Sequence, residues 1–229
     1  MKKDSRIRPD TEKEWMEAII RKDKEAFNLL SRKYRQTVFR IALRMTGDAE
    51  EAEDIAQDVF VKIWLEAGKF DARFSLSTWI YRITNNLCID RLRRAKWMKA
   101  FSFLGFPGSS RTQASRQADF HPGQGNERQS ESPEEQWIAG ESWRVFEKIS
   151  QGLSPKQKSV FLLKEIEGLS TEETAFITGL NPDQIKSNLY WARQSIRKRF
   201  EQYYEGRSSG PEEPEQGPAS KKKPGSRNR

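Results

Sequence analysis

Acidic side chains crowd into one short stretch of this sequence, where they could bind a basic partner. The stretch contains six carboxylates: Asp48, Glu50, Glu51, Glu53, Asp54 and Asp58. No Lys or Arg occurs between Met45 and Val61, so a helix here would repel phosphate rather than bind it. The pattern favours a surface that meets a basic protein. The alternative is a solvated helix whose N-terminal carboxylates are stabilised by the helix dipole.

A second stretch combines aromatic rings with cations. In the helix expected over about 75–94, the polar side carries Trp79, Arg82, Asn86, Arg91, Arg93 and Arg94, and Phe74 lies just upstream. Rings that can stack, placed beside positive charges, are the combination that binds single-stranded DNA. The alternative is that the rings fill a core, as aromatic residues at helical spacing often do.

The last helix, expected over about 182–200, carries groups that could read duplex DNA. Its apolar stripe must face a core and contains Ile185, Leu189, Ala192 and Ile196. The other face can bond phosphates or base edges in a major groove and contains Asp183, Lys186, Ser187, Tyr190, Arg193, Gln194 and Arg197. Gly179 lies in the corner before it, as a helix-turn-helix requires. The alternative is an ordinary solvated helix hairpin.

Nothing in the sequence assembles a catalytic or metal site. The single His, His121, and the single Cys, Cys88, belong to no cluster with the spacing of metal ligands or a catalytic triad. A nuclease with a carboxylate-bound metal would need carboxylates that converge in a pocket, whereas those seen here run along one helix side. We therefore expect no enzyme activity, no metal, no cofactor and no small-molecule substrate.

Periodicity and capping residues predict an all-α fold that positions these faces. The first block, 15–98, contains two glycines and no proline, so its helices have few breaks. In the second block, Ser154, Ser170 and Asn181 each stand three residues before a Glu or Gln that can complete a capping box. We expect two small helical domains joined by a flexible linker, the C-terminal one a helix-turn-helix.

Changes in composition divide the chain into four parts. The two domains are expected at 15–98 and 137–204. The segment 99–136 between them is rich in Ser, Gly, Gln, Arg and Pro, too polar to bury itself, and is predicted to be a flexible linker. Residues 205–229 have the composition of a disordered tail.

The overall charge favours a polyanionic partner. The 229 residues include 41 Lys and Arg against 33 Asp and Glu, for a formal net charge of +8. Such an excess points to nucleic acid through phosphate neutralisation. The charged N-terminus is not followed by an apolar run, and no run of apolar residues is long enough to cross a bilayer. We expect a cytoplasmic protein without membrane insertion.

Two long strings resemble bacterial sigma factors of the extracytoplasmic-function type, in the sigma-70 family. The first runs from DAEEAEDIAQDVFVKIW through STWIYRITNNLCIDRLRR, over 48–94, and the second is LSPKQKSVFLLKEIEGLSTEETAFITGLNPDQIKSNLYWARQSIRKRF, over 153–200. Each motif is weak alone, but their order and pairing are specific. The sequence departs from the family's usual residues at Thr174, Asn188 and Trp191, and two of these positions lie on the last helix.

The resemblance implies a transcription initiation factor that binds core RNA polymerase and directs it to promoter DNA. By motif match, polymerase would bind Asp54, Gln57 and Asp58. The helix over 75–94, with Phe74, would recognise and melt the minus-10 element through the aromatic, Asn and Arg side chains named above. The minus-35 element would be read by Lys186, Ser187, Tyr190, Arg193, Gln194 and Arg197.

The resemblance also implies an anti-sigma factor as a candidate partner. The alternative function is a stand-alone helix-turn-helix regulator, which would leave the acidic helix without an evident use. A flexible linker of about 38 residues would span roughly 35 Å, whereas promoter elements about 23 base pairs apart lie about 80 Å apart. We therefore expect weak promoter binding by the free chain and stronger binding when a scaffold holds the domains apart.

Overall fold

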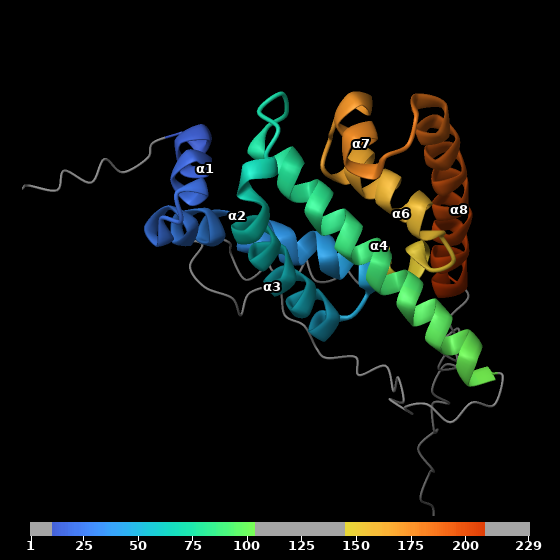
Figure 1. Cartoon of the computed structure of the whole chain (residues 1–229). Helices are drawn as coiled ribbons and strands as arrows, with labels where there is room; N and C mark the ends of the chain where they lie inside the picture. The colour runs from blue at the N-terminus through green and yellow to red at the C-terminus, as the bar shows by residue number, and fades with distance from the viewer. Residues whose placement is uncertain (1–10, 104–144, 209–229) are drawn as a thin grey trace, which may run out of the picture.

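The computed structural model describes residues 11–103 and 145–208, which form an all-helical molecule (Figure 1). The N-terminal unit consists of α1 (Glu12–Ile20), α2 (Lys24–Thr46), α3 (Ala49–Glu66), the short 3-10 turn η1 (Ala67–Lys69) and α4 (Leu76–Phe103). The C-terminal unit consists of helical residues 145–150, α6 (Pro155–Phe161), the wide π-helical turn η2 (Leu162–Ile166), α7 (Thr171–Thr178) and α8 (Pro182–Ser208). The described ranges contain no strand, and the predicted fold class is confirmed.

Local capping explains where the N-terminal helices begin and end. Thr11 and Glu14 form a capping box at the start of α1, and Asp23 accepts from two backbone amides at the start of α2. Gly47 ends α2 in the left-handed conformation, with φ of 77°, which glycine adopts without the steric cost of a side chain. Asp48 then caps α3, so the helix begins with the acidic stretch.

The core of the N-terminal unit lies between α2, α3 and α4. The apolar side of α3 is buried there: Ala52, Ile55, Ala56, Val59 and Ile63. Leu30 and Val38 meet it from α2, and Ile80 meets it from α4. Because each of these side chains is almost fully removed from water, the burial ties the three helices into one body.

Cys88 lies in this core and is expected to be chemically inert. Its side chain is fully buried, and burial raises the pKa of the thiol to about 12. Because the thiolate is the reactive form, a thiol reagent such as dithionitrobenzoate should not modify the folded protein at pH 8. The same reagent should release one equivalent of chromophore in urea. Rapid reaction without denaturant would contradict the burial.

The three predicted helix starts of the C-terminal unit are confirmed. Ser154 and Ser170 form capping boxes with Gln157 and Glu173. Asn181 accepts from the backbone of Gln184 and donates its own amide to that side chain. Gly179 turns the corner between α7 and α8 with φ of 70°. The helix-turn-helix therefore has a first helix, α7, and a candidate recognition helix, α8.

Two helices extend beyond their expected ends. The prediction placed the end of the first helical block at residue 98, but α4 continues to Phe103, since no glycine or proline occurs before Gly105. Helix α8 likewise continues to Ser208, past its expected end near residue 200 and past the expected domain end at 204. The remainder of the predicted linker and tail, in 104–136 and 209–229, lies outside the described residues.

Candidate functional site

The acidic face of α3 presents the three predicted polymerase-binding residues to solvent. The side chains of Asp54 and Asp58 are 58% and 57% exposed, and Gln57 is exposed beside them. Because the opposite side of α3 is buried in the core, this face points to solvent. An exposed cluster of carboxylates on a rigid helix can bind a basic protein surface.

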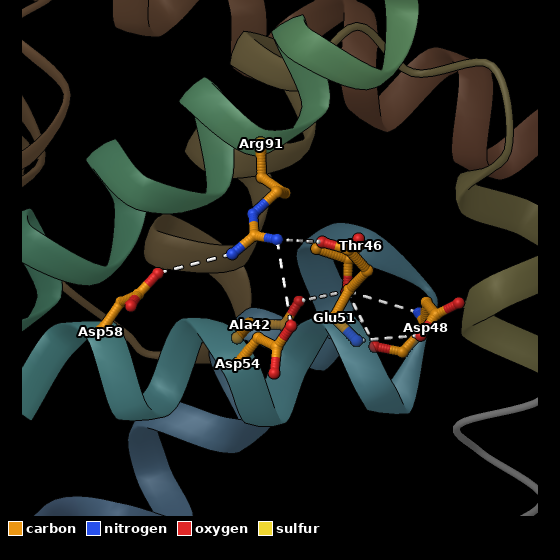
Figure 2. A network of polar contacts seen from close by, with 7 residues as sticks. All are labelled: Ala42, Thr46, Asp48, Glu51, Asp54, Asp58 and Arg91. Carbon is orange, nitrogen blue, oxygen red and sulfur yellow. Dashed lines mark hydrogen bonds and ion pairs between the residues drawn. The ribbon is translucent and has the colours of Figure 1, made fainter. Parts of the chain in front are cut away.

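Arg91 reaches from α4 to this acidic face (Figure 2). Its guanidinium lies 3.3 Å from Glu51, 4.0 Å from Asp54 and 3.4 Å from Asp58. The prediction placed Arg91 among the minus-10 DNA contacts, but here its charge is directed to α3. The physical reason is that the packing of α4 on α3 brings the carboxylates within reach. Arg91 therefore joins the acidic face to the helix that carries the basic residues.

A groove of about 1000 Å³ runs along the other side of α3, against α2. Phe27, Phe60 and Trp64 form its apolar floor, and Gln57 lies at its edge. Val61 and Leu65 also line it, although they are 58% and 68% exposed. The sequence reasoning missed these two residues, whose apolar side chains off the core stripe were the available signal.

Four polar residues of α4 remain exposed where DNA could reach them: Arg82, Asn86, Arg93 and Arg94. Arg93 lies 3.3 Å from Asp90 on the same helix, in a pair exposed to solvent. Exposed pairs of this kind contribute about 0–1 kcal/mol, so a phosphate could displace the carboxylate. These side chains form a basic surface along one side of α4.

Trp79 is not part of that surface. It is only 5% exposed, and its ring packs edge-to-face on Phe70 with centroids 5.6 Å apart. The sequence interpretation placed Trp79 at the border of the polar face as a candidate DNA contact. In this structure the ring belongs to the core and cannot stack on a base. Its burial instead anchors α4 to the core of the N-terminal unit.

Replacing Trp79 with Ala should therefore act on stability. Loss of a buried Trp side chain costs about 3–5 kcal/mol, and urea unfolding followed by circular dichroism should show a loss of that size. Asn86→Ala, on the exposed side of the same helix, should change the free energy of unfolding by less than about 0.5 kcal/mol. A Trp79→Ala variant as stable as the parent protein would contradict the burial.

Phe74 and Arg82 are both engaged by the C-terminal unit. The Phe74 ring stacks on Phe176 of α7 with centroids 4.0 Å apart and an angle of 21°. The Arg82 guanidinium lies over the same Phe176 ring, 4.5 Å from its centroid. Two of the predicted DNA-binding side chains thus have a protein partner, which the sequence reasoning did not anticipate.

The predicted minus-35 face of α8 is exposed along its length. Lys186, Ser187, Tyr190 and Gln194 are exposed, whereas Ile185 and Ala192 are buried on the opposite side. The other two residues of this face also pair with carboxylates at exposed positions, Arg193 with Glu165 at 2.7 Å and Arg197 with Glu201 at 3.0 Å. The departure at Trp191 adds an exposed ring beside this face.

Polar contacts join the two units around Glu167, immediately after η2. Glu167 lies 3.1 Å from Arg44 of α2 and accepts from the Tyr81 hydroxyl at 3.3 Å. Burial, reinforced by the charge of Glu167, raises the pKa of Tyr81 to about 12. Nearby, the Thr78 hydroxyl donates to Glu173 at 3.1 Å. Sequence patterns could not predict this contact, because its partners are far apart in the chain.

A buried part of the same contact lies beside α6. Ser159 donates to the Asn85 side chain, and both residues are buried. Lys158 donates to the backbone carbonyl of Met45 at 3.2 Å, and burial lowers the pKa of its ammonium group. Leu162 joins the apolar core of the N-terminal unit. The interface between the units therefore combines these polar contacts with apolar ones from Leu162 and Phe176.

The described part of the chain contains neither a metal cluster nor a membrane helix. Among the residues described, no group of three or more His, Cys, Asp and Glu could hold a metal ion. Within the same ranges, no helix has both the length and the apolar character needed to cross a membrane.

Two family models match the two units. The model of Sigma-70 region 2 matches residues 30–98, which include the acidic face and the basic surface of α4. The model of Sigma-70 region 4 matches residues 144–196, which include the helix-turn-helix. The matched regions follow one another in the order of the two structural units.

Similar proteins match this chain over most of its length and over nearly all of their own. The chain is 29% identical over 192 residues to the RNA polymerase sigma-H factor of Pseudomonas aeruginosa, covering 84% of this chain and 95% of that protein. It is 28% identical to the ECF RNA polymerase sigma factor SigW of Bacillus subtilis, covering 81% and 98%. The fold is similar to that of the sigma factor RpoE solved with the anti-sigma factor NepR from Bartonella quintana, with a TM-score of 0.54, 22% identity, and coverage of 76% and 96%.

Proposed function

The chain belongs to the extracytoplasmic-function group of the sigma-70 family. We propose that it binds polymerase through α3 and recognises the promoter through α4 and α8. It is a transcription initiation factor that binds core RNA polymerase and directs it to promoters. The observation that carries the assignment is the order of the two matched regions, each with an exposed polar face on a buried scaffold.

The polymerase surface is assigned to α3. Asp54, Gln57 and Asp58 offer two carboxylates and an amide on one exposed helix side, and Gln57 continues into the groove beside α2. Core polymerase would place a basic side chain against the carboxylates and an apolar one in the groove. Arg91 balances the charge of the carboxylates in the free protein, so a basic partner would compete with it.

The minus-10 surface is assigned to the exposed side of α4 and to Phe74. Asn86, Arg93 and Arg94 can bond bases and phosphates of a separated strand without rearrangement of the helix. Phe74 and Arg82 could add a stacking ring and a cation once Phe176 has moved away. Trp79 is left out of this surface because it is buried.

The minus-35 surface is assigned to α8. Lys186, Ser187 and Tyr190 lie near its N-terminal half, where recognition helices contact base edges. Gln194 can read a base or bond a phosphate, and Arg193 and Arg197 can exchange their exposed carboxylate partners for phosphates.

Run-off transcription with purified core polymerase and a pool of genomic promoter fragments tests the function. Specific transcripts that require this protein would support it. Absence of transcripts together with absence of core binding would contradict it and favour the stand-alone helix-turn-helix regulator. We further propose that the protein acts in the cytoplasm without catalysis of its own, and that an anti-sigma factor regulates it, as one binds the RpoE relative.

A further inference from the structure

An exposed tryptophan stands beside the face of α8 assigned to the minus-35 element. Trp191 is 58% exposed, and that assignment gives it no role. Burial of an aromatic ring of this size is strongly favourable, so a partner that covers the ring gains affinity. Because a recognition helix lies in the major groove, the base edges there are the partner nearest to this ring.

Trp191 borders the side chains assigned to base reading. Ser187 stands four residues before it and Gln194 three residues after it, and both are exposed. Residues at these spacings are neighbours on a helix surface. On the other side of Trp191, Asn188 donates its side-chain amide to the Gln184 carbonyl at 2.7 Å. Trp191 therefore belongs to the reading face rather than to the core side of α8.

The Trp191 ring leans toward the middle of this face, because it contacts the ring of Tyr190. The two centroids are 5.4 Å apart, and the rings meet edge-to-face at 77°. Consecutive residues of a helix point about 100° apart, so their rings meet only when each leans toward the other. Ser187 and Gln194 lie in the sector between them. The pair thus places apolar surface among the groups that would contact bases.

The indole ring restricts what Trp191 can recognise. It has no charge to neutralise a phosphate and no acceptor for the amino groups of adenine or cytosine. Its one polar group, Nε1–H, is a donor. In the major groove, thymine presents an apolar C5-methyl group beside an acceptor, O4, whereas guanine presents two acceptors and no methyl group. A ring with a single donor therefore suits thymine best.

We propose that Trp191 selects a thymine in the minus-35 element by covering its C5-methyl group. The proposal rests on the proposed function of α8 as the minus-35 reader, and it adds to that function one residue and one base preference. The Tyr190 ring holds the indole in place from the side. Trp191 is then a specificity-determining residue, while Lys186 and the arginines of α8 supply contacts to phosphates.

Removal of single methyl groups tests the contact in the full chain bound to core polymerase. A promoter fragment that this holoenzyme transcribes is randomised in its minus-35 region and selected for binding. Each thymine of the selected element is then replaced by deoxyuridine, which lacks only the methyl group. At one position the replacement should weaken binding about fourfold, the value of one buried methyl group.

Variants of Trp191 assign the effect to its ring. Trp191→Ala should bind the thymine and deoxyuridine fragments equally. Trp191→Arg should select guanine at the same position, because a guanidinium bonds O6 and N7 together. Trp97→Ala removes a tryptophan that is 65% exposed on α4 and should keep the fourfold effect. Circular dichroism should show that all three variants fold, since both side chains are exposed.

The outcomes separate the contact from the function on which it rests. Binding that is indifferent to deoxyuridine at every thymine, or a methyl effect that persists in Trp191→Ala, would overturn the contact. Weaker binding of core polymerase by Trp191→Ala, with an unchanged base preference, would overturn it in favour of a protein contact. Selection of no common minus-35 sequence by the parent holoenzyme would instead count against the proposed function of α8.

Discussion

Simultaneous replacement of Asp54, Gln57 and Asp58 by Ala is expected to abolish specific transcription by lowering the affinity for core polymerase at least about 100-fold. That factor corresponds to about 2.7 kcal/mol. It is within the range of about 2–5 kcal/mol for removing one side of a desolvated charge contact. Fluorescence titration of labelled protein with core polymerase measures the affinity, and run-off transcription measures the consequence.

The fold should survive this triple change. All three side chains are exposed, and Arg91 keeps Glu51 as a partner 3.3 Å away. Circular dichroism and the melting temperature should confirm that α3 remains helical. Glu50→Ala removes an exposed carboxylate from the same helix and should keep the affinity within about twofold. A triple variant that binds core polymerase as tightly as the Glu50→Ala protein would refute the assignment of this surface.

Replacement of Asn86, Arg93 and Arg94 by Ala is expected to block promoter melting while leaving recruitment of polymerase intact. All three are exposed. Transcription from a duplex promoter should fall about 5- to 150-fold per lost base contact, at about 1–3 kcal/mol each. A template already unpaired at its minus-10 element should recover much of the activity, because the energetic requirement for melting is removed.

The salt dependence distinguishes lost phosphate contacts from general damage. With two cations removed, the slope of log K against log salt for single-stranded DNA should become shallower by about 1.4. Ala at Lys13 of α1 and at Arg21, the residue that caps the end of that helix, removes the same charge from two other exposed positions and should leave the slope unchanged. Equal slopes for the α1 and α4 variants would mean that α4 does not bind the strand.

Features of the fold that depend on neighbours in sequence could be predicted. Ser154, Ser170 and Asn181 begin helices because each bonds a residue three positions away. The burial of Ile55 and Val59 follows from helical spacing alone. Helix ends were harder to predict, since α4 and α8 run on through residues that neither favour nor forbid a helix.

The candidate site could be predicted by region, but less well by residue. Helix α4 packs on α3 and also meets the C-terminal unit, so spacing alone did not separate Trp79, which is buried, from Asn86, which is exposed. Arg91 was assigned to DNA because its neighbours are basic, but the carboxylates that hold it come from another helix. Glu167 and Phe176 escaped notice because their partners lie about a hundred residues earlier in the chain.

The wide turn η2 sets how α6 is rotated about its own axis relative to Glu167, the residue that follows the turn. The Glu167 amide bonds the carbonyl of Leu162, five residues back, so the turn contains one residue more than a regular helix would. Deleting one residue from Leu162–Ile166 would rotate α6 by about 100° relative to Glu167. Either Leu162 would leave the apolar core or Glu167 would leave Arg44. The turn therefore constrains the number of its residues as well as the identity of its buried side chains, Leu162 and Leu163.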